Sequence, residues 1–546
     1  MRIRIGVILR ALLLLTLLAV GPALPAASPD PERTAARVDL LLAEETFGTS
    51  AEGLQRFAPN ADDTTLLRRV SLDLIGRVPT PQEVTLFALD PDPAKQFRLV
   101  NRLLDDHRFG QNWASYWRDV ILYRRSEERA LVSARAVDEY LAGEFNANRP
   151  WNEVASAFIT ATGDVRTDGS TALIMAQAGR PEDTVAEISR IFMGIQIQCA
   201  QCHDHPYDDW KREEFHQLAA FFPRVAVRPD RGKDIRTFVV VGNDLPVFRR
   251  RRNASNRFRG TPEHYMPDLA NPEARGELMQ PVLFATGQSL DNGVTDEQRR
   301  TALAGWITSA DNEWFAKAYV NRMWSELVGE GFYEPVDDLG PDRDYTAPHT
   351  LAYLAQEFAD SGFDVKWLMR TIMATDAYRR ESRSRRDYGE TAFTANRSQR
   401  LRADQLLNVL LAALDIDEGS LLRGNGTGRA RGGPRAAFNL AFGYDPSERR
   451  DQVSGSITQA LAMMNSTAIN SAIRANRPGG LGNLLSEIDD DRTLVSELYL
   501  RSLAREPTTD ELRTCLTCVR DAGRREEAFE DILWSLINST EFLQRR

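Results

Sequence analysis

The sequence predicts a mainly α-helical protein, with two helical domains joined by an irregular, partly β connector. Apolar residues recur at spacings of three and four over most of the chain, which is the pattern of amphipathic helices. One segment alone, Thr237 to Val241, has the unbroken β-branched and aromatic character of a strand. The composition, 42% hydrophobic and 27% charged, is typical of a globular protein.

Residues 1–27 have the pattern of a secretory signal peptide. Arg2, Arg4 and Arg10 supply a positive start, and an almost wholly apolar run extends from Ala11 to Val20. That run is shorter than the about 20 residues of a membrane span. We therefore expect an exported protein, located in the periplasm, in the cell envelope or outside the cell, with an uncleaved N-terminal anchor as the alternative. No later segment is long and apolar enough to span a bilayer, so we expect no transmembrane segment in the mature chain.

Residues 31–223 are predicted to form the first helical domain. Asp62 and Asp63 can cap a helix that ends at Gly76. A single helix is expected from Asp183 to Cys202, where it delivers a Cys/His motif at its C-terminal end. Further helices are expected at Gln96 to Leu104, Trp113 to Leu122, Ala136 to Phe145 and Glu213 to Phe222.

Residues 224–278 are predicted to form the connector with its short β segment, and residues 279–546 the second helical domain. Its main helices are expected at Ala302 to Thr308, Trp314 to Val328, His349 to Ala359, Trp367 to Ala377, Ala403 to Leu414, Ser456 to Met464, Leu494 to Leu503 and Glu527 to Asn538.

The net charge of −10 argues against nucleic acid as a partner. General binding to a phosphate backbone depends on a basic surface, and this chain carries an excess of acidic residues. We expect no nucleic-acid partner.

The strongest chemical signal is the motif Cys199-Ala-Gln-Cys202-His203. Covalent attachment of haem c needs two thiols that can add to the two vinyl groups, followed at once by a histidine that ligates the iron. Haem c is attached outside the cytoplasm, so the signal peptide and the motif support each other. The expected cofactor is haem c, bound through Cys199 and Cys202 with His203 as proximal ligand.

The same segment allows two other interpretations. Zinc or iron could be held by His203 and His205 together with the thiolates of Cys199 and Cys202. The remaining possibility is a local Cys199–Cys202 disulfide in a structural envelope protein. Whether the protein is an enzyme stays open, because the sequence contains no convincing acid/base pair.

The sequence leaves three features unassigned: the sixth ligand of the iron, a second pair of cysteines and an acidic segment. Several residues could in principle be the distal ligand: His216, His349, Met193, Met463 and Met464. Cys515 and Cys518 lie in a helical pattern without a following histidine, which favours a disulfide or buried thiols. The acidic segment from Glu334 to Asp338 could bind a cation, but solvated acidic loops are commoner.

Longer segments resemble a known family. The segments Leu67 to Thr80 and Gln198 to Asp208 resemble the opening and closing signatures of the planctomycete-type secreted cytochrome-like domain, an N-terminal domain of unknown function. Further segments are similar to its usual C-terminal companion, also of unknown function: Phe315 to Trp324, Glu334 to Asp338, Pro348-His349, Phe363 to Leu368, Gln459 to Ser466 and Glu541-Phe542-Leu543.

The resemblance implies a cytochrome-like protein with no established activity. Many relatives carry an additional N-terminal cytochrome domain, whereas this sequence has a single C-x-x-C-H motif. We expect a role in redox chemistry or electron transfer, with a redox partner or an extracellular catabolic enzyme as the protein it serves.

Overall fold

A computed structural model provides the structure of the protein. It describes residues 28–48, 56–124, 130–230, 237–244, 261–340, 343–383, 391–419, 433–449, 452–453, 455–477 and 479–546. The predicted signal peptide, residues 1–27, lies outside the described residues.

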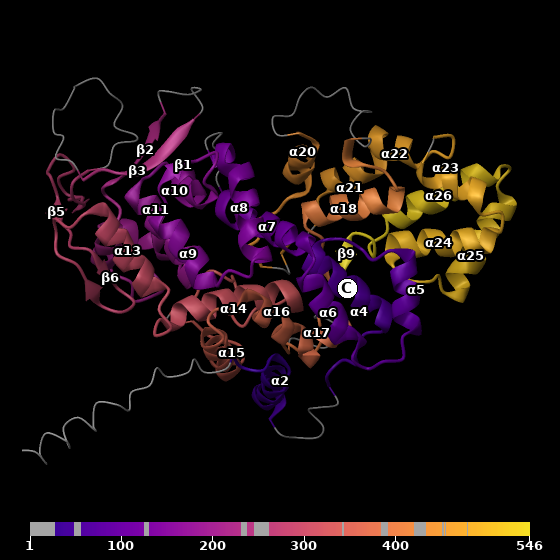
Figure 1. Ribbon diagram of the computed structural model, residues 1–546, viewed down its shortest axis with the longest axis horizontal. Coiled ribbons are helices and arrows are strands. Elements are labelled where there is room, and N and C mark those ends of the chain that lie inside the picture. Colours follow the sequence, from indigo (N-terminus) through magenta and orange to yellow (C-terminus); the bar gives the residue numbers. More distant parts are fainter. Residues whose placement is uncertain are drawn as a thin grey trace, which may run out of the picture.

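Helices dominate the structure, and 58% of the described residues are helical, which confirms the mainly α prediction (Figure 1). In the first part of the chain the α-helices are α2 (Pro31–Phe47), α4 (Asp63–Ile75), α5 (Pro81–Leu89), α6 (Lys95–Leu104), α7 (His107–Leu122), α8 (Ala134–Asn146), α9 (Trp151–Thr160), α10 (Ala172–Ala176), α11 (Pro181–Ile188) and α12 (Arg212–Ala219). Later in the chain they are α13 (Asp296–Ile307), α14 (Glu313–Val328), α15 (Pro348–Asp360), α16 (Val365–Ala374), α17 (Asp376–Arg379), α18 (Ala403–Leu414), α20 (Gly433–Phe442), α21 (Ile457–Asn465), α22 (Thr467–Ile473), α23 (Gly480–Glu487), α24 (Asp491–Leu503), α25 (Thr509–Asp521) and α26 (Arg525–Ile537).

The β structure is small and antiparallel. The predicted strand is present as β3 (Phe238–Gly242), between β1 (Gly163–Asp164) and β2 (Val225–Pro229) in a three-stranded sheet. The remaining strands form two-residue pairs: β4 (Tyr265–Met266) with β5 (Glu277–Leu278), β6 (Val282–Leu283) with β7 (Gln288–Ser289), and β8 (Gln399–Arg400) with β9 (Gln544–Arg545).

Two hydrophobic cores organise the helices. The larger core combines side chains of α4 and α7–α11 with side chains of α14, α15 and α16, so it draws on both sides of the predicted connector. The smaller core is formed mainly by α18 and α21–α26, which lie together at the upper right of Figure 1.

Helix α4 lies between these two cores. The side chain of Asp62 accepts hydrogen bonds from the backbone amides of Thr64 and Thr65, and Gly76 ends the helix in a left-handed conformation, as predicted. Every residue from Leu66 to Ile75 is buried. The helix is covered on more than one side, because Leu72 packs in the smaller core and its apolar neighbours pack in the larger one.

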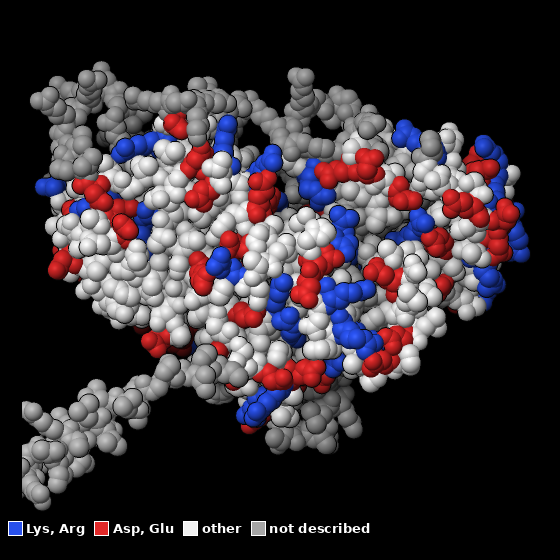
Figure 2. Space-filling model, in the orientation of Figure 1, with Lys and Arg blue, Asp and Glu red and all other residues white. Residues whose placement is uncertain are grey.

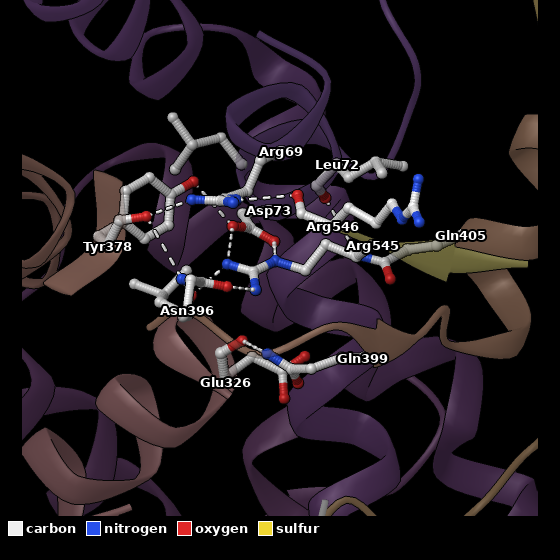
Figure 3. Close-up of polar contacts among 12 residues, drawn as sticks. Arg69, Leu72, Asp73, Glu326, Tyr378, Asn396, Gln399, Gln405, Arg545 and Arg546 are labelled. Atoms are coloured by element: carbon white, nitrogen blue, oxygen red, sulfur yellow. Dashed lines mark hydrogen bonds and ion pairs between the residues drawn. The ribbon is translucent and has the colours of Figure 1, made fainter. Parts of the chain in front are cut away.

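Three charged residues of α4, Arg68, Arg69 and Asp73, are buried, and Figure 3 shows the polar network that joins Arg69 and Asp73 to Arg545 and Arg546. Arg545 in β9 donates through Nε and Nη2 to the two carboxylate oxygens of Asp73, both at 2.8 Å, and Tyr378 donates its hydroxyl to Asp73 at 2.8 Å. Arg69 donates from Nε to the carbonyl oxygen of Arg546 at 2.9 Å. Long-range polar contacts therefore attach α4 to β9.

Charges of both signs are mixed over the face of the molecule drawn in Figure 2. No helix in the part of the chain that the structure describes is long and apolar enough to cross a membrane.

Candidate functional site

The segment that leads to the C-x-x-C-H motif is not one continuous helix. Helix α11 passes into a π-helical turn, Ser189–Met193, and ends at Gly194 in a left-handed conformation with φ of 68°. A side chain at position 194 would be strained by this φ, and a Cβ atom there would lie 2.8 Å from the hydroxyl of Tyr333. The prediction of a single helix to Cys202 is therefore wrong, because the chain turns where a loop of the second half packs against it.

The first motif cysteine, Cys199, lies on a short 3₁₀ turn, Ile197–Gln201, and Cys202 follows directly after this turn. Ile197 and Ala200 are buried and attach the turn to the core, whereas Cys199 and Cys202 are exposed free thiols. This segment therefore presents both thiols to solvent.

His203 is also exposed, and its ring is oriented by the backbone. Its Nδ1 lies 2.7 Å from the carbonyl oxygen of Asp204. Because a carbonyl can only accept, Nδ1 carries the proton and donates, which leaves the lone pair on Nε2. A metal-binding histidine usually has this arrangement, with the distal ring nitrogen as ligand.

His205, unlike His203, has a buried side chain. Its side chain is 4% exposed, and its Nδ1 lies 3.3 Å from the Asp208 carboxylate. Arg343 joins the same cluster through Nη2, at 3.3 Å from Asp208 and 3.2 Å from Asp338. His205 thus takes part in a buried contact between the motif loop and a loop of the second half.

A buried histidine pair supports the motif from inside. His216 on α12 donates from Nε2 to the carbonyl oxygen of Gln201 at 3.1 Å, so its Nδ1 accepts from Nε2 of His264 at 2.9 Å. The two rings are stacked, with centroids 5.2 Å apart. Burial lowers the pKa of both histidines to about 4, and repulsion from the neighbouring His264 ring contributes to this shift in His216.

We expect this pair to make the protein less stable as the pH falls. The unfolded chain binds the two protons near pH 6.5 and the folded chain only near pH 4, so stability is present above about 6.5 and is lost between those values. The free energy of unfolding should fall by roughly 1 kcal/mol per pH unit from this source, allowing for solvent screening.

The measurement is urea denaturation at several pH values between 4 and 7.5. The double variant His216→Phe/His264→Phe should have a shallower pH dependence than the unchanged protein, and His349→Gln, at an exposed position, should retain it. Equal slopes in all three proteins would contradict the expectation.

The acidic segment from Glu334 to Asp338 has a buried residue, Asp337, at its centre. Because Asp337 is paired with arginine, the centre of the segment is neither solvated nor a cation site. Asp337 is fully buried and lies 3.0 Å from Arg190 Nη1, and Gln196 donates to its other oxygen at 2.9 Å. Burial alone would raise the pKa of Asp337, but Arg190, Arg322 and Arg124 together hold it below its usual range. The next residue but one, Leu339, donates its backbone amide to the carbonyl oxygen of Gly194 at 2.5 Å. This loop therefore supports the turn that precedes the motif.

The candidate ligands are thus only partly brought together. Cys199, Cys202 and His203 share the exposed end of the segment, whereas His205 is turned into the protein. Within the described ranges, no three His, Cys, Asp or Glu side chains are grouped so that they could hold a metal ion. Of the suggested distal ligands, His216 has both ring nitrogens in hydrogen bonds, and Met193 and Met463 are buried in the two cores.

Comparison with protein families gives two matches. Residues 38–227 match PSCyt2, a protein of unknown function (DUF1549), and residues 299–421 match PSD1, a protein of unknown function (DUF1553). The chain belongs to this two-domain family. No curated protein and no solved structure matches it.

The PSCyt2 match contains α4, the C-x-x-C-H turn and His216, and the PSD1 match contains Asp337 and Arg343. The contacts between the motif loop and the acidic loop therefore connect the PSCyt2 region to the PSD1 region. The boundaries proposed from sequence at residues 223 and 279 remain predictions.

Cys515 and Cys518 lie on α25, after the PSD1 match. Both are half-buried free thiols, and burial raises the pKa of Cys515.

His264 was missed from the sequence, because nothing near it in the chain links it to a motif about 60 residues earlier. The one signal in the sequence that could have found it was the small number of histidines, six in the chain. Four of them, His203, His205, His216 and His264, lie in or against the motif loop.

Proposed function

We propose that this PSCyt2–PSD1 protein is exported and binds one haem c through Cys199 and Cys202, with His203 as proximal ligand. The observation that supports the proposal is the exposure of two free thiols, Cys199 on the 3₁₀ turn and Cys202 directly after it, followed at once by a histidine with Nε2 available. Bound haem would supply a one-electron redox centre, so the role is in electron transfer or related redox chemistry.

The chain's own residues would perform three tasks at such a centre. The thiols of Cys199 and Cys202 would form the covalent attachment, and the carbonyl oxygen of Asp204 would hold the His203 ring with Nε2 outward. His216 and His264 would support the turn from the buried side. Since the turn is exposed, a redox partner such as an extracellular catabolic enzyme could approach it directly.

The decisive experiment is expression with the native leader in a host that matures c-type cytochromes. We expect the purified and denatured protein to show a c-type pyridine haemochrome spectrum at about one haem per chain. Cys199→Ala should lose most of this signal, because one of the two thioether bonds cannot form. Cys515→Ala, which removes a cysteine outside both family matches, should retain it.

A colourless protein, from a host that matures a control cytochrome, would contradict the haem proposal. The same thiols and His203 could then hold zinc or iron, which metal analysis of the purified protein would reveal, although His205 would have to leave its contact with Asp208 to join them. A metal-free protein with no free thiol at positions 199 and 202 would instead indicate a disulfide and a structural role in the envelope.

A further inference from the structure

A large groove lies outside the C-x-x-C-H turn, between helices α2, α6, α16 and α17, which are grouped in the lower part of Figure 1. Its volume is about 1000 Å³. Pockets for small molecules span roughly 300–1,000 Å³, so this groove has room for a sizeable organic ligand.

Three arginines line the groove, and two of them are each held by an amide of α6. Arg379 donates from Nε to Oε1 of Gln96 at 2.7 Å, and Arg370 donates from Nε to Oδ1 of Asn101 at 2.7 Å. The amides are themselves oriented: Gln96 donates to the carbonyl oxygen of Met373, and Asn101 to that of Phe97, both at 3.1 Å.

This arrangement leaves most of the donors of both arginines unused. A guanidinium has five N–H groups, and here only Nε is bonded to the protein, as far as the described residues go. The remaining Nη1 and Nη2 groups have the planar fork that matches a carboxylate. The positions of both forks are set in advance by Gln96 and Asn101, which reduces the entropic cost of binding.

The other walls of the groove are largely apolar. Leu40 of α2 is 63% exposed and Phe97 of α6 is 48% exposed, and Met373 lines the groove with them. Apolar side chains combined with a few placed polar groups are the usual composition of a ligand site. Arg380 is already occupied, because it donates to the carbonyl oxygen of Phe393 and lies over the ring of Phe57.

We propose that this groove binds a small organic carboxylate, whose carboxylate is held by Arg370 and Arg379 while its apolar body rests against Leu40, Phe97 and Met373. The site is independent of the haem proposal.

The acidic side chains of the groove give the site a pH dependence. They are Glu32, Asp39 and Asp376, and they line the groove together with the cations Arg370, Arg379 and Arg380. Burial raises the pKa of Asp39 to about 7, although its carboxylate accepts from the backbone amide of Asp376 at 3.0 Å. Above pH 7 a charged Asp39 repels an anionic ligand, so binding should strengthen as the pH falls from 8 to 6.

The test uses 2-naphthoate as the anionic probe and 2-naphthamide as its neutral counterpart, in calorimetric titrations of the full chain. We expect naphthoate to bind at least about tenfold more tightly than naphthamide, as charge-assisted hydrogen bonds to a carboxylate would give. Arg370→Gln and Arg379→Gln should each weaken naphthoate binding about tenfold and leave naphthamide binding unchanged. Arg135→Gln, at a position on α8 where the side chain is 90% exposed, is the matched control and should change neither.

Asp39→Asn should remove the dependence of naphthoate binding on pH between 6 and 8, where the probe stays ionised. Thermal melting of each variant shows that it is folded. Naphthoate binding that is absent, or no tighter than that of naphthamide, would overturn the proposal, as would equal losses in the groove variants and in Arg135→Gln.

Discussion

Replacing Asp73 by alanine is expected to lower the free energy of unfolding by about 3–5 kcal/mol, because the change leaves a buried charge without its partner. Asp73 is 6% exposed and receives two hydrogen bonds from Arg545 and one from the Tyr378 hydroxyl. After the substitution, the Arg545 guanidinium keeps Asn396 as a partner, with an Nη1–Oδ1 distance of 2.9 Å, but has no carboxylate in contact among the described residues. Urea denaturation measures the loss.

The same helix provides the control. Asp63 forms a surface ion pair with Lys95 and is 47% exposed, so Asp63→Ala should cost about 0–1 kcal/mol. The double variant Asp73→Leu/Arg545→Met should lose less than Asp73→Ala, because it removes both buried charges together. If Asp73→Ala were no more costly than Asp63→Ala, Arg545 would not be held against α4 in solution.

Asp337→Ala is expected to have an effect of similar size, about 3–5 kcal/mol, in the loop beneath the C-x-x-C-H turn. Arg190 would keep Glu187 at 2.7 Å, but Arg322, which is 2% exposed, would lose the one carboxylate that the described residues place within ion-pair distance of it. Its hydrogen bond to Ser447 Oγ, at 3.3 Å, and its position over the Trp117 ring would remain, and both of these partners are uncharged.

The adjacent residue separates this effect from a general sensitivity of the loop. Asp338 is 24% exposed and pairs with the partly exposed Arg343, so Asp338→Ala should cost only about 0–1 kcal/mol. The two variants should be compared by denaturant unfolding under the same conditions. Similar losses in both would show that the Asp337 cluster contributes no more than a surface pair.

Local patterns predicted the helices well, because each depends on residues close together in the chain. The α4 helix begins at the predicted Asp62 cap and ends at Gly76, and β3 falls on the predicted β-branched run. The end of α11 was not predictable in the same way. Its apolar spacing continues past Gly194, but the contact with the Tyr333 and Leu339 loop, about 140 residues later, interrupts the helix there.

The same difference between local patterns and long-range contacts applies to the candidate site. The motif from Cys199 to His203 can be recognised in the sequence because its residues are contiguous. The structure adds that both of its thiols are exposed. The burial of charged residues on α4 gave no local signal, since Arg69 and Asp73 would ordinarily be placed on a solvent face. Their partners lie up to 477 residues away, at a distance that periodicity cannot detect.

The pairing of α4 with β9 also has a consequence for the order of synthesis. Ribosomes make the chain from its N-terminus, so α4 exists long before residues 544–546 do. Throughout that time Asp73 lacks the arginine that neutralises it, which is 472 residues further on. A chain that lacks Arg545 would therefore lose the partner of a buried carboxylate on α4, between the two hydrophobic cores, and should be degraded as readily as one carrying a core mutation.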